Sequence, residues 1–272
     1  MESLSSRNNP KIKQIRALLQ QRKARRATGL FVMEGIRHVG EAAQAGARIE
    51  YLCYAPELLT SEFAARLIAE QTERGVPCLS VTADLFADLA EKDNPPGILA
   101  VVHQPELHLD QLNPRQHPWL VALVAPQDPG NIGTILRTVD AVGASGLLLL
   151  DHSADPYHPS AIRASMGTIV WHPLVSATFG EFATWAAREG YTIYGTSAHA
   201  ASDYRQVEHY RTPRILLMGS ERQGLTAEQS AICHALLSLP MKGHATSLNL
   251  AVATGVILYS MLQDGNVKTI DH

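Results

Sequence analysis

Apolar residues fall in short runs along the chain, and these runs alternate with segments of helical spacing. In the first hundred residues the apolar runs predict β-strands at residues 30–32, 49–54, 77–81 and 98–102. The segments between them repeat apolar positions at helical intervals, which predicts helices at residues 36–45, 61–73 and 83–90. This alternation indicates a small α/β domain.

A second series of strands and helices begins at Trp119. Its apolar runs predict strands at residues 120–124, 147–150, 169–171, 191–194, 215–218 and 236–239, with helical patterns at residues 132–142, 179–188, 227–234 and 248–262. Strands this short and apolar are typical of a mostly parallel sheet with helices on both faces. Residues 105–118 contain three prolines and have no sustained period. We therefore expect one domain at residues 1–104, a linker at residues 105–118 and a second domain at residues 119–272.

Composition supports a soluble globular protein and excludes several other classes. The 272 residues are 46% hydrophobic and 18% charged, which excludes disordered, collagen-like and coiled-coil chains. The longest apolar-rich stretch, residues 248–262, is shorter than the ~20 apolar residues that cross a bilayer, so no membrane span is expected. Cys53, Cys78 and Cys233 lie far apart and form no CxxC pair, which favours free thiols in the cytoplasm.

Positive charge is concentrated at the start of the chain, although the formal net charge is -3. Residues 3–33 contain no acidic residue and eight lysines and arginines. Such an arm is typical of contact with a polyanion, RNA or DNA, and Arg22, Lys23, Arg25 and Arg26 are its candidate phosphate contacts. A solvated helix face or an organellar transit peptide has a similar composition. Pro10 followed by regularly spaced apolar residues predicts instead a helix that packs into the fold.

Polar residues and glycines gather after three predicted strands, at residues 128–137, 218–224 and 239–249. Open α/β sheets bind ligands at the carboxyl ends of their strands, so these clusters mark a candidate site. Taken singly, each also fits a plain structural role: Asp128 or Asn131 caps a helix, residues 218–224 form an ordinary loop, and Ser247 is an N-cap. Asn249 is expected inside the first turn of an apolar helix, where its poor helix propensity favours a functional role.

Several familiar site types are missing from the sequence. The second cluster is neither a Walker loop nor a GxGxxG fingerprint, so P-loop and Rossmann nucleotide binding are not supported. No GxSxG elbow is present, which argues against a hydrolase. The twelve histidines form no HExxH or paired Cys/His spacing, so no metal is expected.

The three clusters in this order, with residues 163–167 between the first two, resemble the motifs of the SpoU (TrmH-like) ribose methyltransferases of the SPOUT superfamily. Residues 9–13, 25–26, 31–35 and 94–98 resemble the N-terminal substrate-binding domain that many members carry. The resemblance implies transfer of a methyl group from S-adenosylmethionine to a ribose 2′-hydroxyl in rRNA or tRNA. It also implies a homodimer and a C-terminal trefoil knot, which no pattern in the sequence predicts by itself.

Carried over by position, the family's cofactor pocket falls on six residues: Thr196, Leu217, Gly219, Leu239, Met241 and Leu248. An apolar slot edged by backbone groups suits an adenine ring and a sulfonium, although each leucine taken alone also fits core packing. The catalytic group falls on Asn131, Arg137, Glu221, Ser247 and Asn249. We expect Arg137 to bind phosphate as a cation rather than to act as the base, and Glu221 to orient Arg137 or its loop.

One position departs from the family. Relatives often carry Lys where Ser160 stands, which puts an RNA contact at this point in doubt. Arg163 and Ser165 are secondary site candidates, and an ordinary surface helix is the alternative. The separate N-terminal domain favours large-subunit rRNA as the substrate by resemblance. A tRNA methyltransferase and a non-catalytic RNA-binding assembly factor remain the rival functions.

Overall fold

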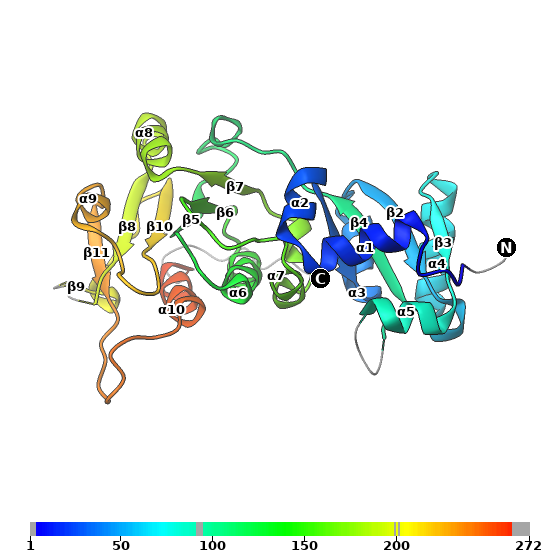
Figure 1. The fold of residues 1–272 in the computed structure, drawn as a ribbon. Helices are drawn as coiled ribbons and strands as arrows, with labels where there is room; N and C mark the ends of the chain where they lie inside the picture. Colours follow the sequence, from blue (N-terminus) through cyan, green and yellow to red (C-terminus); the bar gives the residue numbers. More distant parts are fainter. Residues whose placement is uncertain (1–3, 91–94, 199, 201, 263–272) are drawn as a thin grey trace. The chain divides into compact units, whose positions relative to one another are not determined.

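The computed structural model describes residues 4–90, 95–198, 200 and 202–262, and Asn94 of the N-terminal motif lies outside these residues. The described residues form two compact units, shown in Figure 1. The N-terminal unit contains residues from 1–105 and 155–171, and the C-terminal unit contains residues from 106–154 and 172–272. Each unit is described by itself.

The N-terminal unit is built on a four-stranded sheet in the order β1-β4-β2-β3. Its strands are β1 (Leu30–Glu34), β2 (Ile49–Tyr54), β3 (Cys78–Ser80) and β4 (Ile98–His103), so all four expected strands are confirmed. Its helices up to residue 90 are α1 (Pro10–Gln20), α2 (Arg22–Thr28), α3 (Ile36–Gln44), α4 (Glu62–Glu73) and α5 (Ala83–Ala90), with a 3-10 turn η1 at Pro56–Leu58. Helices α1 and α5 pack on one face of the sheet.

The first helix of the basic arm is part of the fold, as expected. The Asn9 side chain accepts a hydrogen bond from the backbone N of Lys11 at 2.9 Å, and Pro10 occupies the first helical position. Ile12, Ile15 and Leu18 are buried against the sheet, because their spacing places them on one face of α1.

Arg25 corrects the expected RNA contacts of the next helix. Its side chain is only 2% exposed, and its guanidinium pairs with Asp155 at 2.7 Å. It also donates to the backbone oxygen of Leu18 at 2.5 Å. The prediction that Arg25 binds RNA phosphate is therefore wrong, because protein groups already surround its charge. Arg22, Lys23 and Arg26 are exposed.

Residues 155–171 leave the expected second domain and pack within the N-terminal unit. Besides the Arg25–Asp155 pair, the Tyr157 ring lies 4.7 Å from the Phe31 ring, and Trp171 Nε1 donates to Glu41 Oε2 at 2.8 Å. The segment forms the helix α7 (Pro159–Ser165), the alternative expected for Arg163 and Ser165, and a 3-10 turn, η3 (Thr168–Val170).

The strand expected at residues 169–171 is wrong, because these residues form the turn η3. Gly167 precedes the turn with a φ of 97°, where an L side chain is strained. A Cβ on Gly167 would lie 2.6 Å from the Glu41 side chain, so the segment turns closely against α3. On α7, Arg163 is exposed and Ser165 is buried, donating to the backbone oxygen of Ile162.

The C-terminal unit contains a seven-stranded sheet in the order β7-β6-β5-β10-β8-β11-β9, whose neighbouring strands are parallel. The strands are β5 (Trp119–Val124), β6 (Gly146–Leu150), β7 (Leu174–Ala177), β8 (Thr192–Thr196), β9 (Ser202–Asp203), β10 (Arg214–Met218) and β11 (Ala235–Ser238). The expected fold class is confirmed, while β7 and β9 are additional strands. The trefoil knot stays a prediction.

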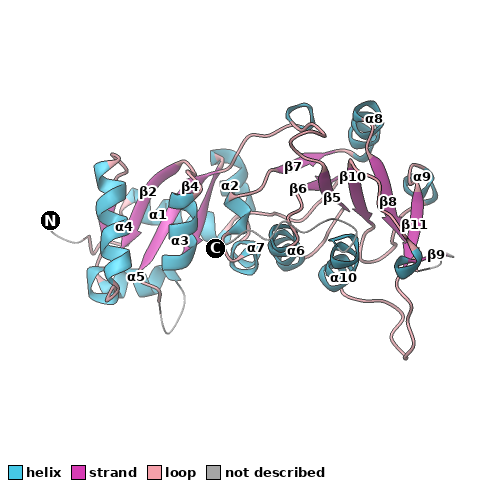
Figure 2. Ribbon diagram, turned by 180° about the vertical axis from the view of Figure 1, so that it is seen from behind, coloured by secondary structure: helices cyan, strands magenta, loops and turns pink. Residues whose placement is uncertain are grey.

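Helices cover both faces of this sheet, with α6 and α10 on one side and α8 on the other in Figures 1 and 2. The helices and 3-10 turns are α6 (Pro129–Ala141), α8 (Phe179–Glu189), α9 (Ala227–Ala231), α10 (Leu250–Leu262), η2 (Leu109–Gln111) and η4 (Tyr204–Gln206). The expected linker belongs to this unit, because Leu112 is buried in the same core as α8. No helix among the described residues is long and apolar enough to span a membrane.

Candidate active site

Three loops meet at the carboxyl edge of the C-terminal sheet. The loops follow β5, β10 and β11. Strand β10 is parallel to β5 and β8, and β8 is parallel to β11, so the carboxyl ends of these strands lie at the same edge of the sheet. A cavity of about 480 Å³ lies there, lined by the ends of β8, β10 and β11, the loops at residues 219–225 and 239–248, and the start of α10. The sequence clusters at residues 218–224 and 239–249 therefore converge on one site.

Five of the six expected cofactor residues line this cavity. They are Thr196, Gly219, Leu239, Met241 and Leu248. Leu217 does not, because alternate residues of β10 point to opposite faces and Leu217 packs in the core with α8. The neighbouring Met218 lines the cavity instead. The Leu217 side chain therefore packs in the core, and a contact of its backbone with the cofactor stays a prediction.

Gly219 is required by the close packing of its own loop. A Cβ at this position would lie 2.1 Å from the backbone carbon of Gly224. Ser220 and Gly224 exchange backbone hydrogen bonds of 3.2 and 2.9 Å, which close the loop on itself. No side chain fits at residue 219, so a substitution there tests the loop before it tests any ligand.

A chain of side-chain hydrogen bonds joins three of the expected catalytic residues. Asn249 Nδ2 donates to Asn131 Oδ1 at 3.0 Å, and Asn131 Nδ2 donates to Glu221 Oε1 at 3.3 Å. Both Glu221 oxygens also accept from the backbone N of Gln127 at 3.2 Å. This Asn131–Glu221–Asn249 network connects the loops after β5, β10 and β11 and borders the cavity through Glu221.

Asn249 has two tasks at the start of α10. Its Oδ1 accepts from the backbone N of Ala251 at 2.8 Å and of Val252 at 3.3 Å, so Asn249 is the N-cap. The helix begins at Leu250. The expectations that Ser247 is the cap and that Asn249 lies within the helix are therefore wrong. Ser247 is exposed and lines the cavity.

Asn131 is available to the network because another residue caps α6. The Asp128 side chain accepts from the backbone N of Gly130 at 2.7 Å, which identifies Asp128 as the N-cap. Asn131 is buried in the first turn of α6. Its amide satisfies its hydrogen-bonding groups through Asn249 and Glu221, as a buried polar group requires.

Arg137 lies apart from this network. It is exposed on α6, and no hydrogen bond or ion pair within the described part of the chain links it to Glu221. Of the two roles expected for Glu221, its contacts therefore fit orientation of the loops and not orientation of Arg137. Gln127 could not be identified from the sequence, because it contributes a backbone N–H that every residue type except proline supplies. Arg222 also lines the cavity and was not anticipated.

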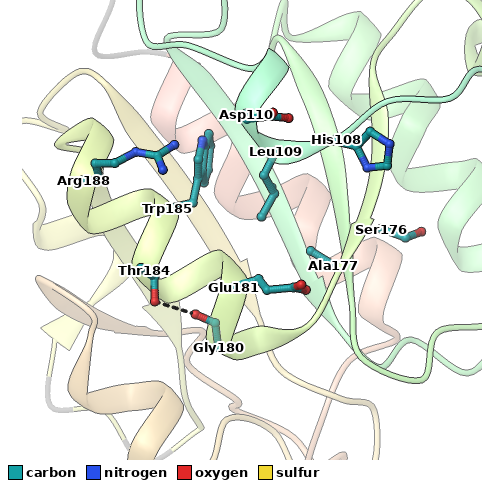
Figure 3. Close-up of a pocket in the computed structure, with 10 residues that line it drawn as sticks. All are labelled: His108, Leu109, Asp110, Ser176, Ala177, Gly180, Glu181, Thr184, Trp185 and Arg188. Carbon is teal, nitrogen blue, oxygen red and sulfur yellow. Dashed lines mark hydrogen bonds between the residues drawn. The ribbon is translucent and has the colours of Figure 1, made fainter.

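A second cavity, of about 590 Å³, lies along η2, β7 and α8 (Figure 3). Figure 3 shows Glu181, Trp185 and Arg188 of α8 along its wall. None of the expected site residues lines it, so the larger cavity is not the candidate active site. Among the described residues no group of three His, Cys, Asp or Glu side chains is placed to hold a metal ion.

Comparison with known families gives two matches that together span most of the chain. The model of the SpoU rRNA Methylase family matches residues 118–259. The model of the MRM3-like substrate binding domain matches residues 9–100. The two matches correspond to the second and first series of strands and helices in the sequence.

Similar proteins align over nearly the whole chain. The 23S rRNA (uridine(2479)-2'-O)-methyltransferase of Streptomyces viridochromogenes is 34% identical over 94% of this chain and 90% of its own length. The 23S rRNA (guanosine(2553)-2'-O)-methyltransferase RlmP of Bacillus subtilis is 29% identical over 96% of this chain and 99% of its own. The AdoMet-bound rRNA methyltransferase of Sinorhizobium meliloti has a TM-score of 0.88, with 34% identity, 96% of this chain covered and 97% of that chain.

Proposed function

Because the chain belongs to the SpoU rRNA methylase family, we propose that it transfers a methyl group from S-adenosylmethionine to a ribose 2′-hydroxyl of 23S rRNA. The observation that carries the proposal is the Asn131–Glu221–Asn249 network beside the cavity at the strand ends. Two relatives that align over nearly the whole chain, N-terminal domain included, are named for 23S rRNA, which supports rRNA as the substrate.

The cavity fits S-adenosylmethionine in size and in chemistry. Its volume of about 480 Å³ is within the range of small-molecule sites. Leu239, Met241 and Leu248 give it an apolar wall for the adenine ring, and the Glu221 carboxylate offers a negative charge to a sulfonium. When bound, the cofactor supplies an electrophilic methyl group.

The residues of this chain position the other reactant. The amides of Asn131 and Asn249 are held in place by each other and by Glu221, and the exposed Ser247 hydroxyl offers a further contact at the cavity. Alignment of the attacking oxygen with the methyl group supplies up to ~7–11 kcal/mol in favourable cases. Preorganised side chains such as these supply that alignment.

Arg137 acts as a cation in this proposal. Its forked guanidinium suits the phosphate next to the target ribose and stabilises the negative charge that develops on the 2′-oxygen. A guanidinium has no basic lone pair to accept a proton, so the hydroxyl proton passes to a phosphate oxygen or to water. The methyl–oxygen bond forms as the methyl–sulfur bond breaks.

We propose that the protein is a homodimer through the outer face of α10. Val252 and Tyr259 are 52% and 51% exposed, and with Val256 they form an apolar stripe along the helix. A Cβ on Gly255 of α10 would lie 3.9 Å from Thr138, the neighbour of Arg137 on α6. A second copy on this stripe therefore lies near Arg137. Val252→Glu is expected to give a monomer in sedimentation, whereas Ala231→Glu on exposed α9 is expected to leave the dimer intact.

The two domains divide the work. The N-terminal unit, which includes residues 155–171, holds the RNA, and the C-terminal unit carries out the transfer. The exposed Arg22, Lys23 and Arg26 on α2 and Arg163 on α7 supply phosphate contacts. Free Cys53, Cys78 and Cys233 support a reducing cytoplasm as the compartment.

Cofactor binding is the first test. Isothermal titration with S-adenosylmethionine is expected to show binding that Met241→Arg abolishes, because the new cation repels a sulfonium inside the cavity. Pro240→Arg adds the same charge at a neighbouring exposed residue that does not line the cavity, and it is expected to bind normally.

Methyl transfer is the second test. Labelled S-adenosylmethionine and unmodified 23S rRNA are expected to yield a 2′-O-methyl nucleoside on digestion and mass spectrometry. Methylation of tRNA alone would replace the rRNA proposal. Cofactor binding without methylation of any RNA, or no cofactor binding by a folded protein, would support the non-catalytic assembly factor.

A further inference from the structure

The N-terminal unit contains a cavity of about 420 Å³ that the active site does not use. It lies between α3 and α4, and we name it the α3–α4 pocket; its lining residues are Ile36, Arg37, Gly40, Glu41, Gln44 and Phe63. Gly40 makes room for an aromatic ring, since a Cβ there would lie 3.1 Å from Phe63 Cζ. The pocket exists because α3 has a glycine where α4 presents its phenylalanine.

Phe63 is unusually open for an aromatic side chain. It is 41% exposed, although the rest of α4 buries Ala64 and Leu67 against the unit. A ring that is anchored on a helix and open to solvent offers a surface for stacking. Phenylalanine has only two side-chain torsions, so it loses little conformational entropy when a ligand stacks on it. Unpaired bases bind proteins by stacking on such rings.

Two arginines flank the ring. Arg37 lines the pocket, and Arg66 lies one turn after Phe63, where spacing of three residues places it on the same side of α4. Both are exposed, and no hydrogen bond or ion pair to either guanidinium is seen among the described residues. Their charges are therefore available to phosphate groups.

The acidic residue of the pocket is held by a neighbour. Glu41 Oε2 accepts a hydrogen bond of 2.8 Å from Trp171 Nε1, and the close approach of Gly167 fixes the Glu41 side chain. Gln44 at the end of α3 adds an exposed amide. The pocket thus combines an open ring, the Arg37 cation and polar groups able to pair with the edge of a base, while Arg66 adds a second cation outside the lining.

We infer that the α3–α4 pocket binds an unpaired nucleotide of the substrate RNA, with its base stacked on Phe63 and its phosphates contacted by Arg37 and Arg66. This inference rests on the proposed function, because it takes the N-terminal domain to hold the RNA. The composition favours RNA over a second copy of this chain: the apolar part comprises Ile36 and one ring, and arginines border it, whereas the core of a homodimer interface is largely apolar.

The principal test changes the ring alone. Phe63→Leu keeps an apolar side chain and removes the stacking surface, and it is expected to weaken binding of a 23S rRNA fragment about 10-fold in a filter assay. Phe63→Trp is expected to restore binding. Circular dichroism and urea unfolding are expected to be the same for all three proteins, which shows that the N-terminal unit is folded in each.

The second test separates the charges from the ring. Arg37→Gln and Arg66→Gln are each expected to reduce the slope of log Kd against log salt by about 0.7, whereas Phe63→Leu leaves the slope unchanged. Arg115→Gln, an exposed arginine of the C-terminal unit, serves as the matched control and is expected to bind RNA normally. Ultraviolet cross-linking is expected to attach a nucleotide to the peptide that contains Phe63.

Three results would overturn the inference: RNA binding that Phe63→Leu leaves unchanged, a wild-type protein that does not bind 23S rRNA, or loss of the dimer in sedimentation when Phe63 is replaced. The last would assign the pocket to a second copy. Failure of the proposed function gives a different result. If the protein transferred no methyl group but its RNA binding still depended on Phe63, the proposed activity would be wrong and the nucleotide pocket would stand.

Discussion

Arg25 and Arg137 show two opposite uses of an arginine within one chain. Arg25 is enclosed in the N-terminal unit, where Asp155 and a backbone oxygen satisfy its charge. Arg137 is exposed on α6 of the C-terminal unit, the helix that also carries Asn131, and takes no part in the Asn131–Glu221–Asn249 network. A charge that the protein satisfies internally serves the fold, whereas an exposed charge on a helix of the site is available to a substrate.

The largest expected effect follows from breaking the enclosed pair. Arg25→Ala is expected to destabilise the N-terminal unit by about 3–5 kcal/mol in urea unfolding, because it leaves the Asp155 carboxylate buried without its partner. Arg26→Ala, at the exposed neighbour, is expected to change stability by less than about 0.5 kcal/mol. Equal losses of stability in Arg25→Ala and Arg26→Ala would show that the buried pair with Asp155 does not stabilise the unit.

The exposed arginine is expected to show the reverse behaviour. Arg137→Lys keeps the positive charge but loses the paired donors of the guanidinium. We therefore expect kcat to fall by about 100-fold and the free energy of unfolding to stay the same. Single-turnover methylation and urea titration measure the two properties. Near-full turnover by Arg137→Lys would show that the guanidinium geometry is not needed.

Asn249 allows the two roles to be separated within one residue. Asn249→Asp keeps the oxygen that caps α10 but loses the amide that donates to Asn131, so we expect kcat to fall about 10-fold with stability retained. Asn249→Ala also loses the cap and is expected to cost about a further 1 kcal/mol of stability. If the Asp variant were as active as the wild type, the network would have no part in positioning the ribose.

The exposed charges of α2 give a smaller, distributed effect. Replacing Arg22, Lys23 and Arg26 by Gln is expected to weaken RNA binding and to reduce its salt slope by about 2. Arg25→Gln is expected to lower stability without this change of slope, since its guanidinium already pairs with Asp155. An unchanged slope in the triple variant would refute α2 as an RNA contact.

The smallest expected effect concerns pH. Burial lowers the pKa of His38 below its usual 6.5, and the backbone groups of Arg163 and Glu34 oppose this shift only in part. The unfolded chain therefore takes up the proton more readily, so stability is complete above about pH 6.5 and falls as the pH drops below it. Thermal unfolding of His38→Gln is expected to show a weaker dependence on pH between 5 and 7, while an unaltered dependence would exclude His38 as its source.

Most strands and helices were predictable because each buries one face, so its apolar residues repeat along the sequence with the period of a strand or a helix. The four strands of the N-terminal sheet and the loops after β10 and β11 were identified in this way. The strand expected at residues 169–171 failed because apolar residues that pack as a 3-10 turn against α3 look like a strand in sequence. The side chain of Leu217 packs in the core and not in the cavity, because the elements on each face of the sheet decide which side of a central strand borders a cavity.

The sequence by itself determined the fold class, the three strand-end clusters and the residue types that resemble a ribose methyltransferase, since these depend on local spacing and on motifs. Only the tertiary structure decided which of those residues meet. It paired Arg25 with Asp155 across 130 positions, joined Asn131 to Glu221 and Asn249, and drew residues 155–171 into the N-terminal unit. Such contacts depend on the packing of distant elements, which no local period specifies.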